Sequence, residues 1–210
     1  MKKILATTAV LFSSLCCIAA SAAEGDVGVE APMDDRYCTT CHGAEGGGNI
    51  AVEGPRLAGM EPWYLKRQLE NFRAGIRGTH PEDIQGIAMR PMAAKLSDAS
   101  IADIVEWVGS WEYVPAEITI EGNANQGRTI YQTCATCHGA DGGGNEALGA
   151  PALAGQNDWY MVTQLKNFRA GYRGTHAEDT FGSQMRAMVQ SLRDEQAILN
   201  VVSYINTLQK

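Results

Sequence analysis

Cys38-Thr39-Thr40-Cys41-His42-Gly43 decides the fold, and the same pattern returns ninety-six positions later as Cys134-Ala135-Thr136-Cys137-His138-Gly139. Two thiols separated by two residues can reach the two vinyl groups of one porphyrin and form thioethers, and the next residue can place its imidazole on the iron. A Cys-x-x-Cys pair alone would also fit a redox disulfide or half of a zinc site. Because a histidine follows both pairs, the sequence predicts two covalent haem c groups. We expect thioethers at Cys38, Cys41, Cys134 and Cys137, and axial imidazoles at His42 and His138.

The first 23 residues have the features of a secretory signal. Two lysines are followed by an apolar run over residues 4–18 and by Ala20-Ser21-Ala22, a small-residue cleavage site. The run is too short for a membrane span, and the residues before Cys16 and Cys17 do not resemble a lipidation box. We therefore expect residues 1–23 to be removed and the mature protein to be soluble in the periplasm. The other four of the six cysteines all belong to the haem motifs.

The sequence contains an internal duplication. Residues 38–98 align without a gap against residues 134–194, and 36 of these 61 pairs are identical. Such similarity predicts two copies of one domain. Each copy is small, and a covalently held haem would supply apolar bulk to its core. We expect an N-terminal domain at 24–112, a linker at 113–122 and a C-terminal domain at 123–210.

Helical periodicity dominates both copies, and no strand-like alternation is visible. Middle helices are predicted at 62–74 and 158–170, each followed by glycine. A closing helix begins at Ser97 or Asp98, and its counterpart continues to the chain end with apolar residues at helical spacing. A leading helix is expected before the second haem motif, running through residues 128–131 into Cys134, and a shorter one is expected before the first motif. The sequence therefore predicts an all-α protein.

Composition restricts the classes of partner. The formal charge is −7, and removal of the two lysines of the signal segment makes it −9. An acidic surface argues against nucleic acid or anionic lipid and favours a basic patch on another protein, although negative charge also serves solubility alone. No Ser-His-Asp spacing, paired carboxylate motif or zinc-type cluster that would support hydrolysis is apparent in the sequence.

The second axial ligand of each iron is left open by the residues themselves. Each copy keeps two methionines and one further histidine as candidates: Met89, Met92 and His80, and Met185, Met188 and His176. A thioether raises the reduction potential and suits electron transfer, a second imidazole gives a lower potential, and an open position allows ligand chemistry. Methionine is also a common core filler, so packing is an alternative for each one.

The segment Met89-Arg90-Pro91-Met92-Ala93-Ala94-Lys95-Leu96-Ser97-Asp98, placed after the first haem motif and Leu57-Ala58-Gly59, resembles the dihaem cytochrome c4 family. The second copy resembles it through Leu153-Ala154-Gly155, Gln164-Leu165, Phe168-Arg169 and Met185-Arg186. The resemblance covers nearly the whole mature chain and implies tandem class I cytochrome c domains packed face to face about a pseudo-two-fold axis. It also implies Met89 and Met185 as axial ligands, ahead of Met92 and Met188. The twin Gly-Thr-His-x-Glu-Asp segments do not fit the family pattern.

The function expected from these patterns is electron transfer rather than catalysis. We expect a periplasmic electron carrier between a membrane quinol-oxidising complex and a terminal oxidase or another acceptor. One alternative is the haem subunit of an enzyme complex, such as a sulfide-oxidising flavoprotein. Another is a dihaem peroxidase, against which the similarity of the two copies argues, because a peroxidase needs one iron with an open position.

Overall fold

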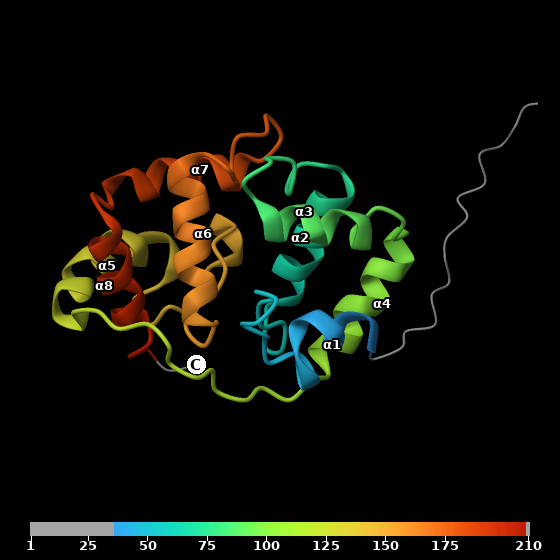
Figure 1. The fold of residues 1–210 in the computed structure, drawn as a ribbon, viewed down its shortest axis with the longest axis horizontal. Helices are drawn as coiled ribbons and strands as arrows, with labels where there is room; N and C mark the ends of the chain where they lie inside the picture. Colours follow the sequence, from blue (N-terminus) through green and yellow to red (C-terminus); the bar gives the residue numbers. More distant parts are fainter. Residues whose placement is uncertain (1–35, 209–210) are drawn as a thin grey trace, which may run out of the picture.

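Two helical domains, joined by an irregular segment, make up the part of the chain that the structure describes (Figure 1). The structure is a computed structural model and describes residues 36–208. Within that range β pairing is limited to two isolated bridges, Asn49 with Gly54 and Asn145 with Ala150. This confirms the predicted all-α class. The predicted signal segment, including Cys16 and Cys17, lies outside the described residues.

The two domains repeat the same order of helices. The first contains α1 (Arg36–His42), η1 (Ala44–Gly46), α2 (Pro62–Arg73), α3 (Ile84–Ala93) and α4 (Asp98–Gly109). The second contains α5 (Ala124–His138), η2 (Glu146–Leu148), α6 (Asp158–Ala170), α7 (Thr180–Met188), η3 (Val189–Ser191) and α8 (Glu195–Ile205).

Side-chain caps fix where the closing helices begin. Ser97 accepts a hydrogen bond from the backbone N–H of Ser100, and Asp194 accepts one from that of Ala197. The middle helix α6 ends at Gly171, whose φ of 79° allows the chain to leave the helix. The predicted middle and closing helices are therefore confirmed. One detail was wrong: α8 ends at Ile205 and does not continue through Leu208, because the chain turns there and the Leu208 N–H bonds to the Ile205 carbonyl.

Helices α3 and α7 were not predicted, and they account for the twin Gly-Thr-His-x-Glu-Asp segments. The aspartate of each segment caps the helix: Asp83 accepts from the Gly86 N–H, and Asp179 accepts from the Gly182 N–H. The first glycine of each segment has a positive φ, and a Cβ at Gly78 would meet the Gly86 carbonyl oxygen at 2.2 Å. The segments are thus loops that turn the chain tightly into the helices bearing the candidate methionines.

Each domain buries the apolar face of its closing helix. In the first domain Ile101, Ile104 and Val108 of α4 pack against Leu65 and Leu69 of α2. In the second domain α8 packs against α5 and α6 through a larger cluster: Tyr131, Met161, Val162, Phe168, Ile198, Val201, Val202 and Ile205. The segment between the domains has no regular structure over residues 112–123.

Candidate haem sites

The second haem motif lies at the carboxyl end of α5. Cys134 and Cys137 are three residues apart on a helix, so both thiols are on the same face. His138 is buried, and its Nδ1 lies 2.7 Å from the carbonyl oxygen of Pro151. A carbonyl can only accept, so Nδ1 carries the proton and Nε2 is free for a metal. His42 of the first motif makes the matching bond, 2.7 Å from Nδ1 to the Pro55 carbonyl oxygen.

A cavity of about 1420 Å³, counting its open mouth, lies against the second motif. Cys134, Cys137 and His138 form one side, and Met185 and Met188 of α7 also line it. The remaining wall is mainly apolar and includes Leu153, Met161, Leu165, Phe168, Val189, Leu192, Val201 and Ile205. The fold therefore brings Cys134, Cys137, His138, Met185 and Met188 to one cavity, which has the apolar character of a cofactor site.

The chemistry of the cavity fits haem c. Its apolar wall suits a porphyrin face, and burial raises the pKa of the Cys134 thiol. Arg173 also lines it, 8% exposed, and its hydrogen-bond partners are the neutral side chains Tyr64, Gln68 and Gln164. The Nε of Arg173 is buried with no hydrogen-bond partner. A buried cation whose hydrogen-bond partners are neutral is costly; Asp179 is a nearby carboxylate, and the propionates of a haem would supply further negative charge.

The two methionines of each copy differ in their surroundings. Met185 packs against the core cluster of the second domain, whereas Met188 is 41% exposed. In the first domain Met89 packs against the core cluster of α2 and α4. Met92 is half-buried on the next turn of α3. The inner methionine of each helix is therefore the one in contact with the core.

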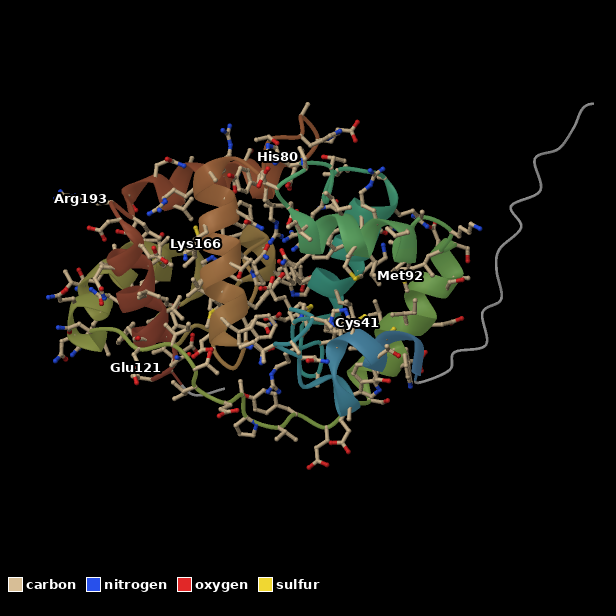
Figure 2. All side chains as sticks on the ribbon, viewed as in Figure 1. Cys41, His80, Met92, Glu121, Lys166 and Arg193 are labelled. Carbon is tan, nitrogen blue, oxygen red and sulfur yellow. The ribbon has the colours of Figure 1, made fainter. Side chains whose placement is uncertain are left out.

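The remaining histidines lie away from the cavity. His80 and His176 are in the loops before α3 and α7, and His80 stacks on Tyr172 of the other domain with ring centroids 4.5 Å apart. Figure 2 shows His80 at the edge where the two domains meet. The residues that line the cavity do not include His176.

None of the four motif cysteines is in a disulfide, so all four thiols are available for attachment to haem. In the first domain burial raises the pKa of the Cys38 thiol, and Cys41 adds to this, while Cys41 itself is exposed. Burial lowers the pKa of His42 and of His138, and in each case the bond to a proline carbonyl opposes the shift. Both imidazoles are therefore favoured in the neutral form that binds iron.

Two buried arginines join the domains in a nearly symmetric network. Arg77 donates to Gln68 of its own domain at 2.8 Å and to Tyr160 and Gln164 of the other at 3.1 and 3.0 Å. Arg173 does the converse, donating to Gln164 at 2.8 Å, to Tyr64 at 3.3 Å and to Gln68 at 2.9 Å. Burial alone would raise the pKa of Tyr64, but the arginines around it lower that pKa.

This network was missed in the sequence. The hydroxyls of Tyr64 and Tyr160, at equivalent positions of the two copies, accept from arginines across the interface. The available signal was that Tyr64, Gln68 and Arg77 all recur ninety-six positions later. In Figure 1, α2 and α6, which contribute the tyrosines and glutamines, face each other at the centre of the molecule.

Comparison with known proteins agrees with this geometry. The family model for cytochrome c matches residues 31–112 and again 124–209. A cytochrome c4 from Stutzerimonas stutzeri is 31% identical over 79% of this chain and 82% of its own length. The crystal structure of reduced recombinant cytochrome c4 from Pseudomonas stutzeri superposes with a TM-score of 0.64 at 30% identity, over 82% of this chain and 93% of that one.

The chain belongs to the dihaem cytochrome c4 family. Two cytochrome c domains, each with its Cys-x-x-Cys-His motif, mean two covalent haem c groups per chain. The protein is a cytochrome c4-like electron carrier.

A relative with a more specific name is also similar to this cytochrome. A thiosulfate dehydrogenase electron acceptor from Stutzerimonas stutzeri (strain A1501) is 35% identical over 72% of this chain and 71% of its own length. That name describes a redox partner of an enzyme. Among residues 36–208 no helix is long and apolar enough to cross a membrane.

Proposed function

We propose that this cytochrome c4 carries single electrons in the periplasm, from a quinol-oxidising complex to a terminal oxidase or another acceptor. The proposed domain boundaries are 24–112 and 123–210, with a linker at 113–122. The end of α4 at Gly109, the start of α5 at Ala124 and the two segments matched by the family model support these boundaries.

The proposed haem ligands are the residues expected from the sequence. Thioethers form at Cys38 and Cys41 and at Cys134 and Cys137, and the axial pairs are His42 with Met89 and His138 with Met185. When bound, each haem supplies a one-electron ferric–ferrous couple. The Pro55 and Pro151 carbonyls hold the two imidazoles, Met89 and Met185 would each supply a thioether ligand to an iron, and apolar side chains would keep water from the porphyrin.

One observation carries the proposal: Met185 and His138 line the same cavity as Cys134 and Cys137, and Met185 is in contact with the core. An iron closed on both sides passes electrons and does not bind substrate. The duplication extends the argument to Met89, which packs against the equivalent cluster of the first domain.

Replacement of the methionines tests the proposal. We expect Met185→Ala and Met89→Ala each to lower the potential of one haem, remove half of the methionine-to-iron charge-transfer band and allow carbon monoxide to bind to one iron. Met188→Ala is the matched control, because Met188 is more exposed and lies on the same helix. Carbon monoxide binding by Met188→Ala but not by Met185→Ala would move the ligand to Met188.

A second candidate function is favoured by the name of one relative. The similarity to a thiosulfate dehydrogenase electron acceptor supports a role in which an oxidising enzyme, and not a quinol-oxidising complex, reduces this cytochrome. Stopped-flow reduction of the oxidised protein by a purified thiosulfate dehydrogenase with thiosulfate distinguishes the two. Reduction on the millisecond-to-second timescale favours the enzyme as donor, and no reduction within minutes argues against it.

A further inference from the structure

The motif histidines His42 and His138 are each connected to the opposite domain by two hydrogen bonds that run through one peptide group. In the second domain the His138 Nδ1–H donates to the Pro151 carbonyl at 2.7 Å. The same peptide group ends in the Ala152 N–H, which donates at 2.8 Å to a carboxylate oxygen of Glu61 in the other domain. A chain of two hydrogen bonds therefore runs from the imidazole to a carboxylate.

The first domain has the same chain with a different end. The His42 Nδ1–H donates to the Pro55 carbonyl at 2.7 Å, and the Arg56 N–H of that peptide donates at 2.7 Å to the side-chain oxygen of Asn157. Glu61 and Asn157 occupy equivalent positions in the duplication, immediately before α2 and α6. One copy thus ends in an anion and the other in a neutral amide.

The residue that follows this proline also differs in charge between the two copies. Arg56 follows Pro55, whereas Ala152 follows Pro151. Arg56 is only 4% exposed, and its Nε and one Nη are buried without hydrogen-bond partners. The other buried arginines do not distinguish the domains, because Arg77 and Arg173 occupy equivalent positions. The peptide after Pro55 therefore has a nearby cation and an amide at its N–H, whereas the peptide after Pro151 has an anion at its N–H. Arg67, whose counterpart is Thr163, also lines the second cavity, where it donates to the Gly149 carbonyl and not to the Pro151 peptide.

The charges act on the irons in a definite direction. A carboxylate on the peptide N–H polarises the peptide, so its carbonyl accepts more strongly from the histidine and the imidazole becomes a stronger donor to iron. The negative charge itself also favours the ferric state. Both effects lower the reduction potential of the second haem, while the charge of Arg56 raises that of the first.

We propose that Glu61 sets the order of the two potentials from the opposite domain, making the haem attached at Cys134 and Cys137 the lower-potential one. This inference rests on the proposed function, because it requires both irons to be redox-active and axially closed. The step is one-electron exchange: the second iron goes from ferrous to ferric as the first goes from ferric to ferrous, with no bond made and no proton moved. Electrons therefore collect on the haem of the first domain.

Glu61 is a positioning residue that acts through the Ala152 peptide, so its test measures the reduction potentials of the two haems. In a spectroelectrochemical titration of the dihaem protein, Glu61→Gln should raise the lower potential until the equilibrium constant for electron sharing between the haems falls roughly tenfold, about 59 mV for a one-electron couple. Gln keeps an oxygen that can accept the Ala152 N–H, so a merely structural role leaves both potentials in place. Glu106→Gln, which removes an exposed charge of the same domain, is the control and should change neither potential.

Two further variants assign each reduction potential to one haem, so that the test does not depend on the Glu61→Gln protein alone. In the Met185→Ala background the lowered potential marks the second haem, and it must be the same one that Glu61→Gln raises. Asn157→Asp should lower the potential of the first haem and narrow the gap.

The outcomes separate the inference from the proposed function. Two normal one-electron waves that Glu61→Gln leaves unmoved overturn the role of Glu61 and leave the electron carrier intact. If Glu61→Gln shifts the higher reduction potential instead of the lower one, that result also overturns the role of Glu61. A wild-type protein that has no covalent haem, or shows no methionine-to-iron absorption band, would instead contradict the proposed function.

Discussion

At the scale of single residues, Asp158 shows how one buried carboxylate joins distant parts of the chain. It accepts hydrogen bonds from the backbone N–H groups of Thr119 and Ile120 at 2.7 and 2.8 Å, and from the side chain of Asn206 at 3.0 Å. The interdomain segment and the end of the chain are thus both held to the start of α6. Burial alone would raise the pKa of Asp158, but these hydrogen bonds outweigh it and hold the pKa below its ordinary value.

Replacement of Asp158 by Asn tests this junction. The amide oxygen could still accept the N–H groups of Thr119 and Ile120, which share one carboxylate oxygen, but the amide nitrogen would face the Trp159 N–H that the other oxygen now accepts. The lost charge and acceptor should cost about 3 kcal/mol of unfolding free energy. Because the folded pKa is depressed, the wild-type contribution is present above about pH 4 and is lost as the pH falls through the folded pKa. Urea unfolding at pH 7 and pH 3 measures it. A difference between wild type and variant that does not shrink at pH 3 would contradict the account.

At the scale of elements, the crossing of α5 and α8 depends on the absence of a side chain at Gly127. A Cβ there would lie 1.9 Å from the Asn200 carbonyl oxygen and 2.8 Å from the Cβ of Tyr204. The side chain of Asn200 continues the contact, because its amide oxygen accepts from the Asn123 N–H at 2.8 Å. The haem motif at the end of α5 is therefore positioned by the way α5 packs on α8.

Gly127→Ala should push these helices apart and destabilise the second domain by about 2 kcal/mol. Gly109→Ala in α4 is the comparison, because nothing lies within 4 Å of a Cβ at that position. The free energy of unfolding of that variant should be unchanged or higher by up to about 1 kcal/mol, because alanine has a higher helix propensity than glycine. Thermal unfolding followed by circular dichroism decides between them, and equal effects of the two substitutions would show that the crossing tolerates a methyl group.

The elements also show what a sequence can predict. Helices α2, α4, α6 and α8 have an apolar face, and caps or glycines mark their ends, so their periodicity was visible. Helices α3 and α7 are short and expose several of their apolar residues, Ile84, Ile87, Phe181 and Met188. In addition, α3 contains Pro91, which argues locally against a helix. Their aspartate caps were read only as part of an unassigned loop. Local pattern therefore predicted the middle and closing helices, and not the short methionine-bearing helices.

At the scale of the whole molecule, the two domains are held together largely by polar contacts. The contacts come in matched pairs, with Glu61 and Asn157 each bonding the other domain's backbone and Arg77 and Arg173 sharing the same two glutamines. A polar interface of buried groups depends on every partner, because one lost acceptor leaves a buried charge unpaired. Sequence alone could not predict these pairs, since contacts between residues about ninety positions apart leave no periodic signal.

Gln68→Leu should weaken the association of the domains. Its side-chain oxygen accepts from both Arg77 and Arg173, so its loss removes two hydrogen bonds to buried cations and should cost about 3 kcal/mol. We expect the single unfolding transition of the haem-loaded protein to separate into two in differential scanning calorimetry. Gln132→Leu, an exposed substitution on α5, should leave the calorimetric trace unchanged. A single, unshifted transition for Gln68→Leu would mean that the arginine network does not couple the domains.

The central claim concerns the whole chain: two haems, each bound by thioethers and closed by histidine and methionine, form a one-electron carrier. A potentiometric titration of the purified, haem-loaded protein, followed by its Soret and methionine-to-iron absorption bands, tests it most directly. The account predicts two one-electron waves, two covalent haems by mass spectrometry and no carbon monoxide binding by the wild-type protein. A colourless protein, a single wave accompanied by only one haem, or carbon monoxide bound to either wild-type iron would contradict it.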